Sequence, residues 1–146
     1  RMFMDNPLKT PGSITALGTA IDMSKVQVPA YVVAGITDHI TPWQACYQSR
    51  NVLKGKLDFV LSSSGHIQSI VNPPTNPKAK YFLNSNLPDD AETWRAGATE
   101  HAGSWWEHWK EWYRRHGDGE TPAPKTVGSA RHPAGDPAPG RYVHQR

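Results

Sequence analysis

Two short apolar runs, over residues 28–34 and 56–62, stand out in a chain that is otherwise polar and interrupted by proline and glycine. The first run reads VPAYVVA and is followed by Gly35, and the second reads KLDFVLS and leads into a small-residue turn at Gly65. Continuous apolar residues are typical of strands buried on both faces of a parallel sheet. The pattern therefore predicts two buried strands over these ranges.

The segment between the two runs, TPWQACYQSRNVLKG over 41–55, carries helix signals. Thr41 and Gln44 match a capping box, Pro42 suits the first helical position, and Gly55 suits the stop. Strand, helix and strand form a βαβ unit, so we expect an α/β fold in which the two strands are parallel. Two strands do not make a stable sheet. Residues 1–27 offer only two short extended pieces, in SITAL and TAIDM, and we therefore expect the remaining strands outside this chain.

The second half of the chain predicts helices and a tail. After a proline-rich loop with a short apolar patch at Tyr81–Leu83, helices are expected over 89–102 and 104–117, the second opening with a capping box at Ser104 and Glu107. Five of the six tryptophans lie between residues 94 and 112, mostly spaced by three and four, which favours a helical stripe packed against a domain.

The same patterns divide the chain into four segments. We expect a loop-rich lead-in over 1–27, part of a catalytic α/β core over 28–87, a Trp-rich helical segment over 88–116, and an extended tail over 117–146 that is rich in proline and glycine.

Composition limits the possible functions. The net charge of +3 is mild and the basic residues are scattered, so a nucleic-acid partner is not expected. One cysteine excludes an intramolecular disulfide, and no apolar run approaches the roughly 20 residues of a membrane helix. The chain begins with Arg1 rather than Met, so we expect that an N-terminal part is missing.

Asp38 and His66 are the candidate catalytic residues. Each follows the carboxyl end of one predicted strand, where active sites of open parallel sheets gather. A carboxylate beside an imidazole suits nucleophilic catalysis, in which the histidine is the base and the carboxylate orients it. The order Asp then His matches the α/β-hydrolases. The alternative is structural: Asp38 caps the following turn, and His66 is an ordinary loop histidine.

A nucleophile is not found in this chain. Cys46 lies within the helix expected behind the first strand, and we interpret it as a small buried hydrophobic residue. The G-x-[SC]-x-G turn that carries the nucleophile in α/β-hydrolases does not occur. Histidine and cysteine spacings give no metal site, and no cofactor is expected.

Four stretches resemble one family: DHITPWQACYQS, FVLSSSGHIQSIVNPP, WRAGATEHAGSWWEHW and PAPGRYV. They look like the C-terminal part of the polyhydroxyalkanoate synthases, bacterial polyester polymerases, and the likeness extends from about Asn6 to Val143. The resemblance implies an α/β-hydrolase core that joins (R)-3-hydroxyacyl-CoA units into polyester with release of CoA. It also implies a cytoplasmic protein at the polyester granule surface, a homodimer when full length.

By this resemblance, Asp38 matches the catalytic aspartate and His66 the catalytic histidine of a Cys-His-Asp triad. The cysteine would come from the N-terminal remainder of the synthase, so the chain alone is expected to be inactive. Two roles for Asp38 stay open: orienting His66, or activating the 3-hydroxyl of the incoming unit. Whether the chain is a natural fragment or a truncation also stays open.

Two other hypotheses compete. The chain could belong to another α/β-hydrolase, an esterase or polyester depolymerase. It could also be a non-catalytic module whose tryptophans bind a polymer surface or a protein.

Overall fold

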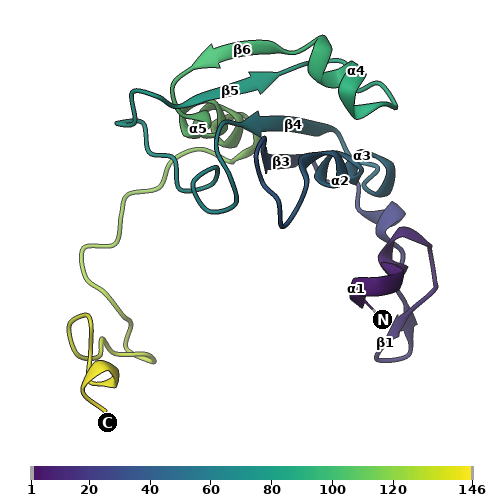
Figure 1. Cartoon of the computed structure of the whole chain (residues 1–146). Helices are drawn as coiled ribbons and strands as arrows, with labels where there is room; N and C mark the ends of the chain where they lie inside the picture. The colour runs from purple at the N-terminus through teal and green to yellow at the C-terminus, as the bar shows by residue number, and fades with distance from the viewer. Residues whose placement is uncertain (1, 146) are drawn as a thin grey trace.

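A four-stranded sheet forms the centre of the computed structural model, which describes residues 2–145 (Figure 1). Its strands are β3 (Ala30–Gly35), β4 (Leu57–Ser62), β5 (Lys80–Leu83) and β6 (Thr99–Ala102), in the order β3-β4-β5-β6. β3 and β4 are parallel, whereas β4 pairs with β5, and β5 with β6, in antiparallel fashion. The predicted α/β class and the predicted parallel pair are confirmed.

The expectation that the remaining strands lie outside this chain is wrong for β5 and β6. β5 follows the proline-rich loop, and only Phe82 of its four residues is buried, which makes its apolar signal weak. β6 reads TEHA and was expected to be helical, but the preceding helix, α4 (Ala91–Ala96), ends before Gly97. As an edge strand with no buried residue, β6 has no apolar pattern to reveal it.

The helix expected over 41–55 consists of two short helices, α2 (Trp43–Tyr47) and α3 (Ser49–Val52). The predicted capping box is not formed. The Thr41 hydroxyl donates instead to Asp38, and the Gln44 side chain donates to Glu92 on α4. The segment still crosses from the end of β3 to the start of β4, as a parallel pair requires.

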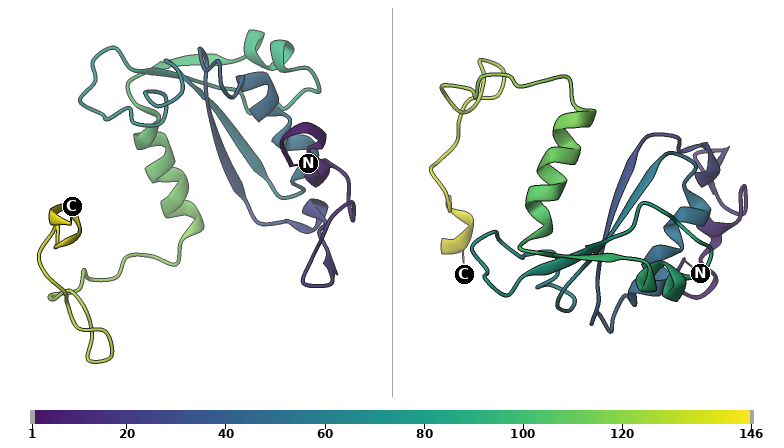
Figure 2. Two further views of the ribbon diagram at one scale, coloured as in Figure 1. Left: turned by 60° about the horizontal axis from the view of Figure 1, so that its bottom comes forward. Right: turned by 90° about the horizontal axis from the view of Figure 1, so that it is seen from above.

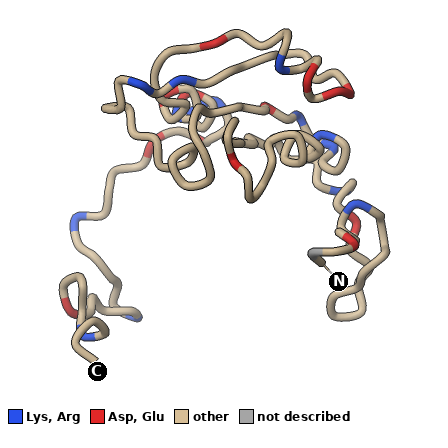
Figure 3. Tube along the Cα trace, viewed as in Figure 1, with Lys and Arg blue, Asp and Glu red and all other residues tan. Residues whose placement is uncertain are grey.

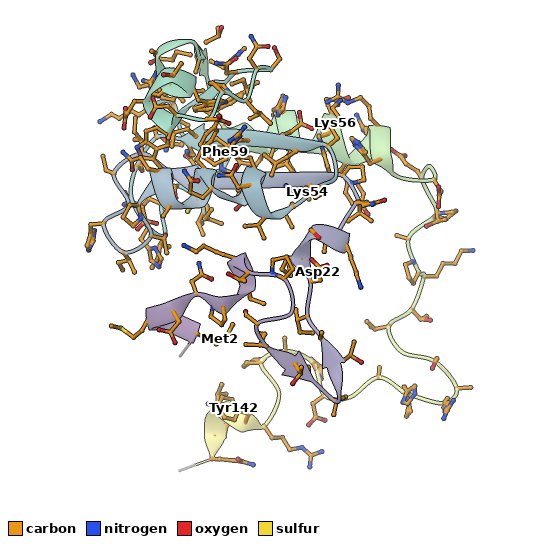
Figure 4. The ribbon with its side chains drawn as sticks, turned by 90° about the vertical axis from the view of Figure 1, so that its right-hand side faces the viewer. Met2, Asp22, Lys54, Lys56, Phe59 and Tyr142 are labelled. Carbon is orange, nitrogen blue, oxygen red and sulfur yellow. The ribbon has the colours of Figure 1, made fainter. Side chains whose placement is uncertain are left out.

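Helices cover both faces of the sheet, with α2 and α3 on one side and α5 (Trp105–His116) on the other (Figure 2). The core lies on the first face. Trp94 of α4 is fully buried, and its ring meets Phe59 of β4 edge to face with 4.9 Å between centroids. Phe59 in turn meets Tyr47 of α2 at 5.0 Å, and Figure 4 shows Phe59 deep within these packed side chains.

Helix α5 packs across the second face through polar contacts. The Tyr31 hydroxyl lies 2.7 Å from His108 Nδ1, and Trp112 Nε1 donates to Asp58 Oδ2 at 2.8 Å. The N-cap half of the predicted capping box is confirmed, since Ser104 Oγ accepts from the Trp106 backbone N–H, whereas the Glu107 side chain pairs with Lys110. The single stripe expected from Trp94 to Trp112 is divided between α4, β6 and α5. The tryptophans nevertheless serve mainly as packing residues, with Trp109 the exposed exception.

The two ends of the described chain extend away from the sheet. The lead-in contains short elements: α1 (Met2–Asp5), the 3-10 helices at Pro7–Lys9 and Met23–Lys25, and the hairpin of β1 (Thr15–Ala16) and β2 (Thr19–Ala20). The hairpin strands confirm the two short extended pieces predicted there. Residues 118–145 are almost all exposed and end in a 3-10 helix at Tyr142–His144, far from the sheet in Figure 1.

Charged residues of both signs are interspersed along the chain (Figure 3). None of the helices within residues 2–145 has the length and hydrophobicity required to cross a bilayer.

Candidate active site

The structure brings Asp38 and His66 together at the carboxyl edge of the parallel pair. Gly35 and Ser62, the last residues of β3 and β4, are paired in register, so both connecting loops leave the sheet at the same level. The Ile36 N–H donates to the Ser62 carbonyl at 3.0 Å and keeps the two loops together beyond the strands. As a result, His66 Nδ1 lies 2.9 Å from Asp38 Oδ2.

Asp38 is held as a carboxylate by four donors. Oδ1 accepts from the backbone N–H groups of Ile40 at 2.9 Å and Thr41 at 3.0 Å. Oδ2 accepts from the Thr41 hydroxyl at 2.8 Å and from His66. These bonds, led by the Thr41 backbone N–H and including His66, lower the pKa of Asp38 far below its ordinary value, although desolvation opposes them. An ionised Asp38 has no proton to donate, so His66 must carry its proton on Nδ1.

In the neutral imidazole, Nε2 is then the ring nitrogen that can accept a proton. Its side chain is 44% exposed, while that of Asp38 is only 6% exposed. No hydrogen-bond partner of Nε2 occurs within residues 2–145. A neutral imidazole oriented by a buried carboxylate can take a proton from a thiol, hydroxyl or water that approaches Nε2.

Tight backbone packing sets the distance between the two loops. Gly35 lies against the turn that carries His66, and a Cβ atom at Gly35 would lie 2.7 Å from Ser69 Oγ. Ser64, two residues before His66, has a φ of +83°, an uncommon conformation for a residue with a side chain. Ser64 thus holds a strained backbone conformation in the turn that places His66 beside Asp38.

Sequence reasoning missed the role of Thr41. Its residue type and position matched a helix cap, but both its backbone N–H and its hydroxyl bind Asp38. The D-x-x-T spacing is the available signal, because a carboxylate readily accepts from a backbone N–H two or three residues ahead. The alternative in which Asp38 caps the following turn is thus also correct in part. Asp38 binds the turn at Ile40 and Thr41 and contacts His66 as well.

Cys46 does not join this pair. It lies in α2, half-buried against the core, and its thiol donates to the Thr41 carbonyl at 3.8 Å. Burial raises the pKa of the Cys46 thiol above its ordinary value, which disfavours the reactive thiolate. In the described part of the chain, no three His, Cys, Asp or Glu side chains gather into a group that could hold a metal ion.

No protein-family model matches the chain. Individual proteins do. Poly(3-hydroxyalkanoate) polymerase 1 of Ectopseudomonas oleovorans is 47% identical over 145 residues, or 99% of the chain. The polymerase subunit PhaC of Cupriavidus necator is 43% identical over 97% of the chain, and that of Rhizobium meliloti is 37% identical over 99%.

The chain is a homologue of one part of the poly(3-hydroxyalkanoate) polymerases. It covers 26% of the first relative's length and 24% of the second's, so it spans about a quarter of the proteins that it matches. The resemblance to the C-terminal part of a polyhydroxyalkanoate synthase is confirmed at this level. The Asp38–His66 pair lies inside the matched region of these polymerases, because the match covers nearly the whole chain.

Proposed function

We propose that this chain supplies the acid–base half of a polyhydroxyalkanoate synthase active site, with Asp38 and His66 as its catalytic residues. The hydrogen bond between His66 Nδ1 and Asp38 Oδ2 is the observation that carries the proposal. The name of the relatives supports the chemistry, since each is described as a poly(3-hydroxyalkanoate) polymerase.

The proposed reaction begins with a cysteine in the N-terminal remainder of the synthase. His66 Nε2 takes the thiol proton, and the thiolate attacks the thioester carbonyl of an (R)-3-hydroxyacyl-CoA. The bond from the carbonyl carbon to the CoA sulfur breaks, and CoA leaves with the proton from the His66 imidazolium. The acyl group is now a thioester of the enzyme.

Chain growth is the attack of a 3-hydroxyl oxygen on an enzyme-bound thioester carbonyl. The hydroxyl proton passes to His66 and then to the departing cysteine sulfur, so an ester forms and the thiol is restored. Both oxygens of Asp38 are occupied by donors and its side chain is 6% exposed, which favours orienting His66 over direct contact with the substrate hydroxyl.

The test uses the full-length synthase and the release of CoA from 3-hydroxybutyryl-CoA. Asp38→Asn should lower kcat by about 1,000- to 10,000-fold, since the amide can stabilise the wrong tautomer of His66, and His66→Gln should lower kcat at least as much. Asp90→Asn is the matched control. Asp90 Oδ2 likewise accepts from Thr93 N at 2.7 Å and Thr93 Oγ1 at 2.8 Å, but no histidine is among its partners. Normal turnover of the Asp38 and His66 variants would refute the proposal.

The remaining expectations stay predictions. They are the homodimer of the full-length protein, its place at the polyester granule surface in the cytoplasm, and the division of the chain at residues 27, 87 and 116.

A further inference from the structure

Within residues 2–145, no backbone N–H donates to two carbonyls of the segment after His66, those of Ser69 and Ile70. Residues 66–70 form turns rather than a helix, and an N–H four residues ahead would normally bind each carbonyl of a helical segment. For Ser69 and Ile70 those positions are Pro73 and Pro74, which have no N–H. The NPP stretch therefore leaves these carbonyls to be satisfied by donors from elsewhere.

The first residues of α5 provide those donors. Trp105 Nε1 donates to the Ser69 carbonyl at 2.8 Å, and Trp106 Nε1 donates to the Ile70 carbonyl at 2.9 Å. The Ser104 hydroxyl donates to the Asn72 carbonyl. We name these three consecutive residues, Ser104–Trp106, the indole clamp.

The apolar side chains of residues 66–71 do little to hold this segment in place. Its apolar residues Ile67, Ile70 and Val71 are exposed. Ser69, in contrast, is 1% exposed, and its hydroxyl donates to the carbonyl of His66 at 3.2 Å. A continuous path of hydrogen bonds thus runs from Trp105 through Ser69 to the backbone of His66.

The clamp itself is anchored to the sheet. Further along α5, the Trp112 indole donates to Asp58 of β4 at 2.8 Å, and His108 Nδ1 lies 2.7 Å from the Tyr31 hydroxyl of β3. β3 and β4 are also the strands that deliver Asp38 and His66. Helix α5 therefore connects the segment after His66 to β3 and β4, the same two strands that position Asp38.

We propose that Trp105 and Trp106 are positioning residues that hold the His66 segment through their indole N–H groups, so that the imidazole stays in reach of Asp38. The proposal rests on the proposed function, in which His66 is the base. It explains why two tryptophans stand side by side: each indole N–H replaces a backbone donor that Pro73 or Pro74 cannot supply.

The test uses the full-length synthase with Trp105 and Trp106 replaced singly, first by phenylalanine and then by benzothienylalanine, whose ring keeps the shape of indole but has sulfur in place of N–H. Hydrogen exchange over residues 65–71 should accelerate about five- to tenfold in each variant, since one hydrogen bond is lost from a locally opening segment. The kcat should fall about fivefold with KM unchanged, because a displaced base affects the chemical step rather than substrate binding.

Trp109→Phe is the matched control, because it replaces an exposed tryptophan of the same helix that belongs neither to the clamp nor to the hydrogen bonds that anchor it. It should leave exchange over 65–71 and kcat within twofold of the parent. Unchanged exchange in the Trp105 and Trp106 variants would overturn the proposal, as would equal acceleration in Trp109→Phe. If His66→Gln retains full turnover, the proposed function fails, whereas the exchange measurements still decide whether the clamp exists.

Discussion

Gly35→Ala tests whether the end of β3 must lie directly against the turn that carries His66. The added Cβ would lie 2.7 Å from Ser69 Oγ, 2.8 Å from Ser69 Cβ and 2.9 Å from the Ser64 carbonyl oxygen. Nonbonded carbon atoms are most stable near about 3.5–4 Å, so strand and turn have to separate by roughly 1 Å. Ser69 cannot simply rotate away, because it is buried and two of the three contacts are to its Cβ or to backbone.

The expected cost is about 1–3 kcal/mol in the free energy of unfolding, as for other additions to a packed interior. A 1 Å displacement of His66 should also lower kcat/KM by roughly 100-fold. Urea unfolding and CoA release by the full-length synthase measure the two effects. Ser69→Gly in the same chain removes two of the three close contacts and should recover part of both losses.

Gly65→Ala is the control within the same turn. Its Cβ would come no nearer than 3.4 Å to the Thr37 carbonyl oxygen, an ordinary contact, so stability should change by less than about 1 kcal/mol. Wild-type stability and turnover of Gly35→Ala would refute the reasoning, as would a larger loss in Gly65→Ala.

Three further predictions concern the rest of the molecule. Burial lowers the pKa of His108 below its ordinary value, so the unfolded chain binds a proton more readily than the folded chain. The free energy of unfolding should therefore fall as the pH drops below about 6.5. Urea titrations at several pH values should show this dependence, and His108→Gln should flatten it. Trp94→Ala removes a fully buried ring from the core and should cost about 3–5 kcal/mol by the same measurement, whereas Trp109→Ala, at an exposed ring, should cost under about 1 kcal/mol. Cys46→Ala should leave kcat within twofold, and a loss comparable to that of His66→Gln would contradict the exclusion of Cys46 from the site.

The parallel pair was predictable because β3 and β4 are continuous apolar runs that end in small residues. Helix α5 was predictable from Ser104 and Gly117 at its ends. β5 and β6 were not, because their conformation is imposed by pairing, such as Leu61 opposite Phe82, rather than by their own residues. The helix expected over 41–55 is interrupted at Gln48, and Asp38 engages Thr41, the residue that was expected to cap it.

The candidate pair followed from a rule of topology rather than from a local motif. Once two strands are parallel, the residues after their carboxyl ends must lie on one edge, and this placed Asp38 near His66. The indole clamp has no comparable signal. Trp105 and its acceptor Ser69 are 36 residues apart, and only the folded chain shows that they meet.

Within residues 2–145, β3 pairs with β4 alone, which leaves the other flank of β3 open. The unpaired edge of a strand is a site at which a second polypeptide can add a strand of its own. Under the proposed function, a synthase divided at this strand edge would gain the base His66 only when the two pieces associate. If this chain were the scarcer of the two pieces, its amount would set the number of complete active sites. For a fixed supply of monomer, that number would then set how long each polyester molecule grows.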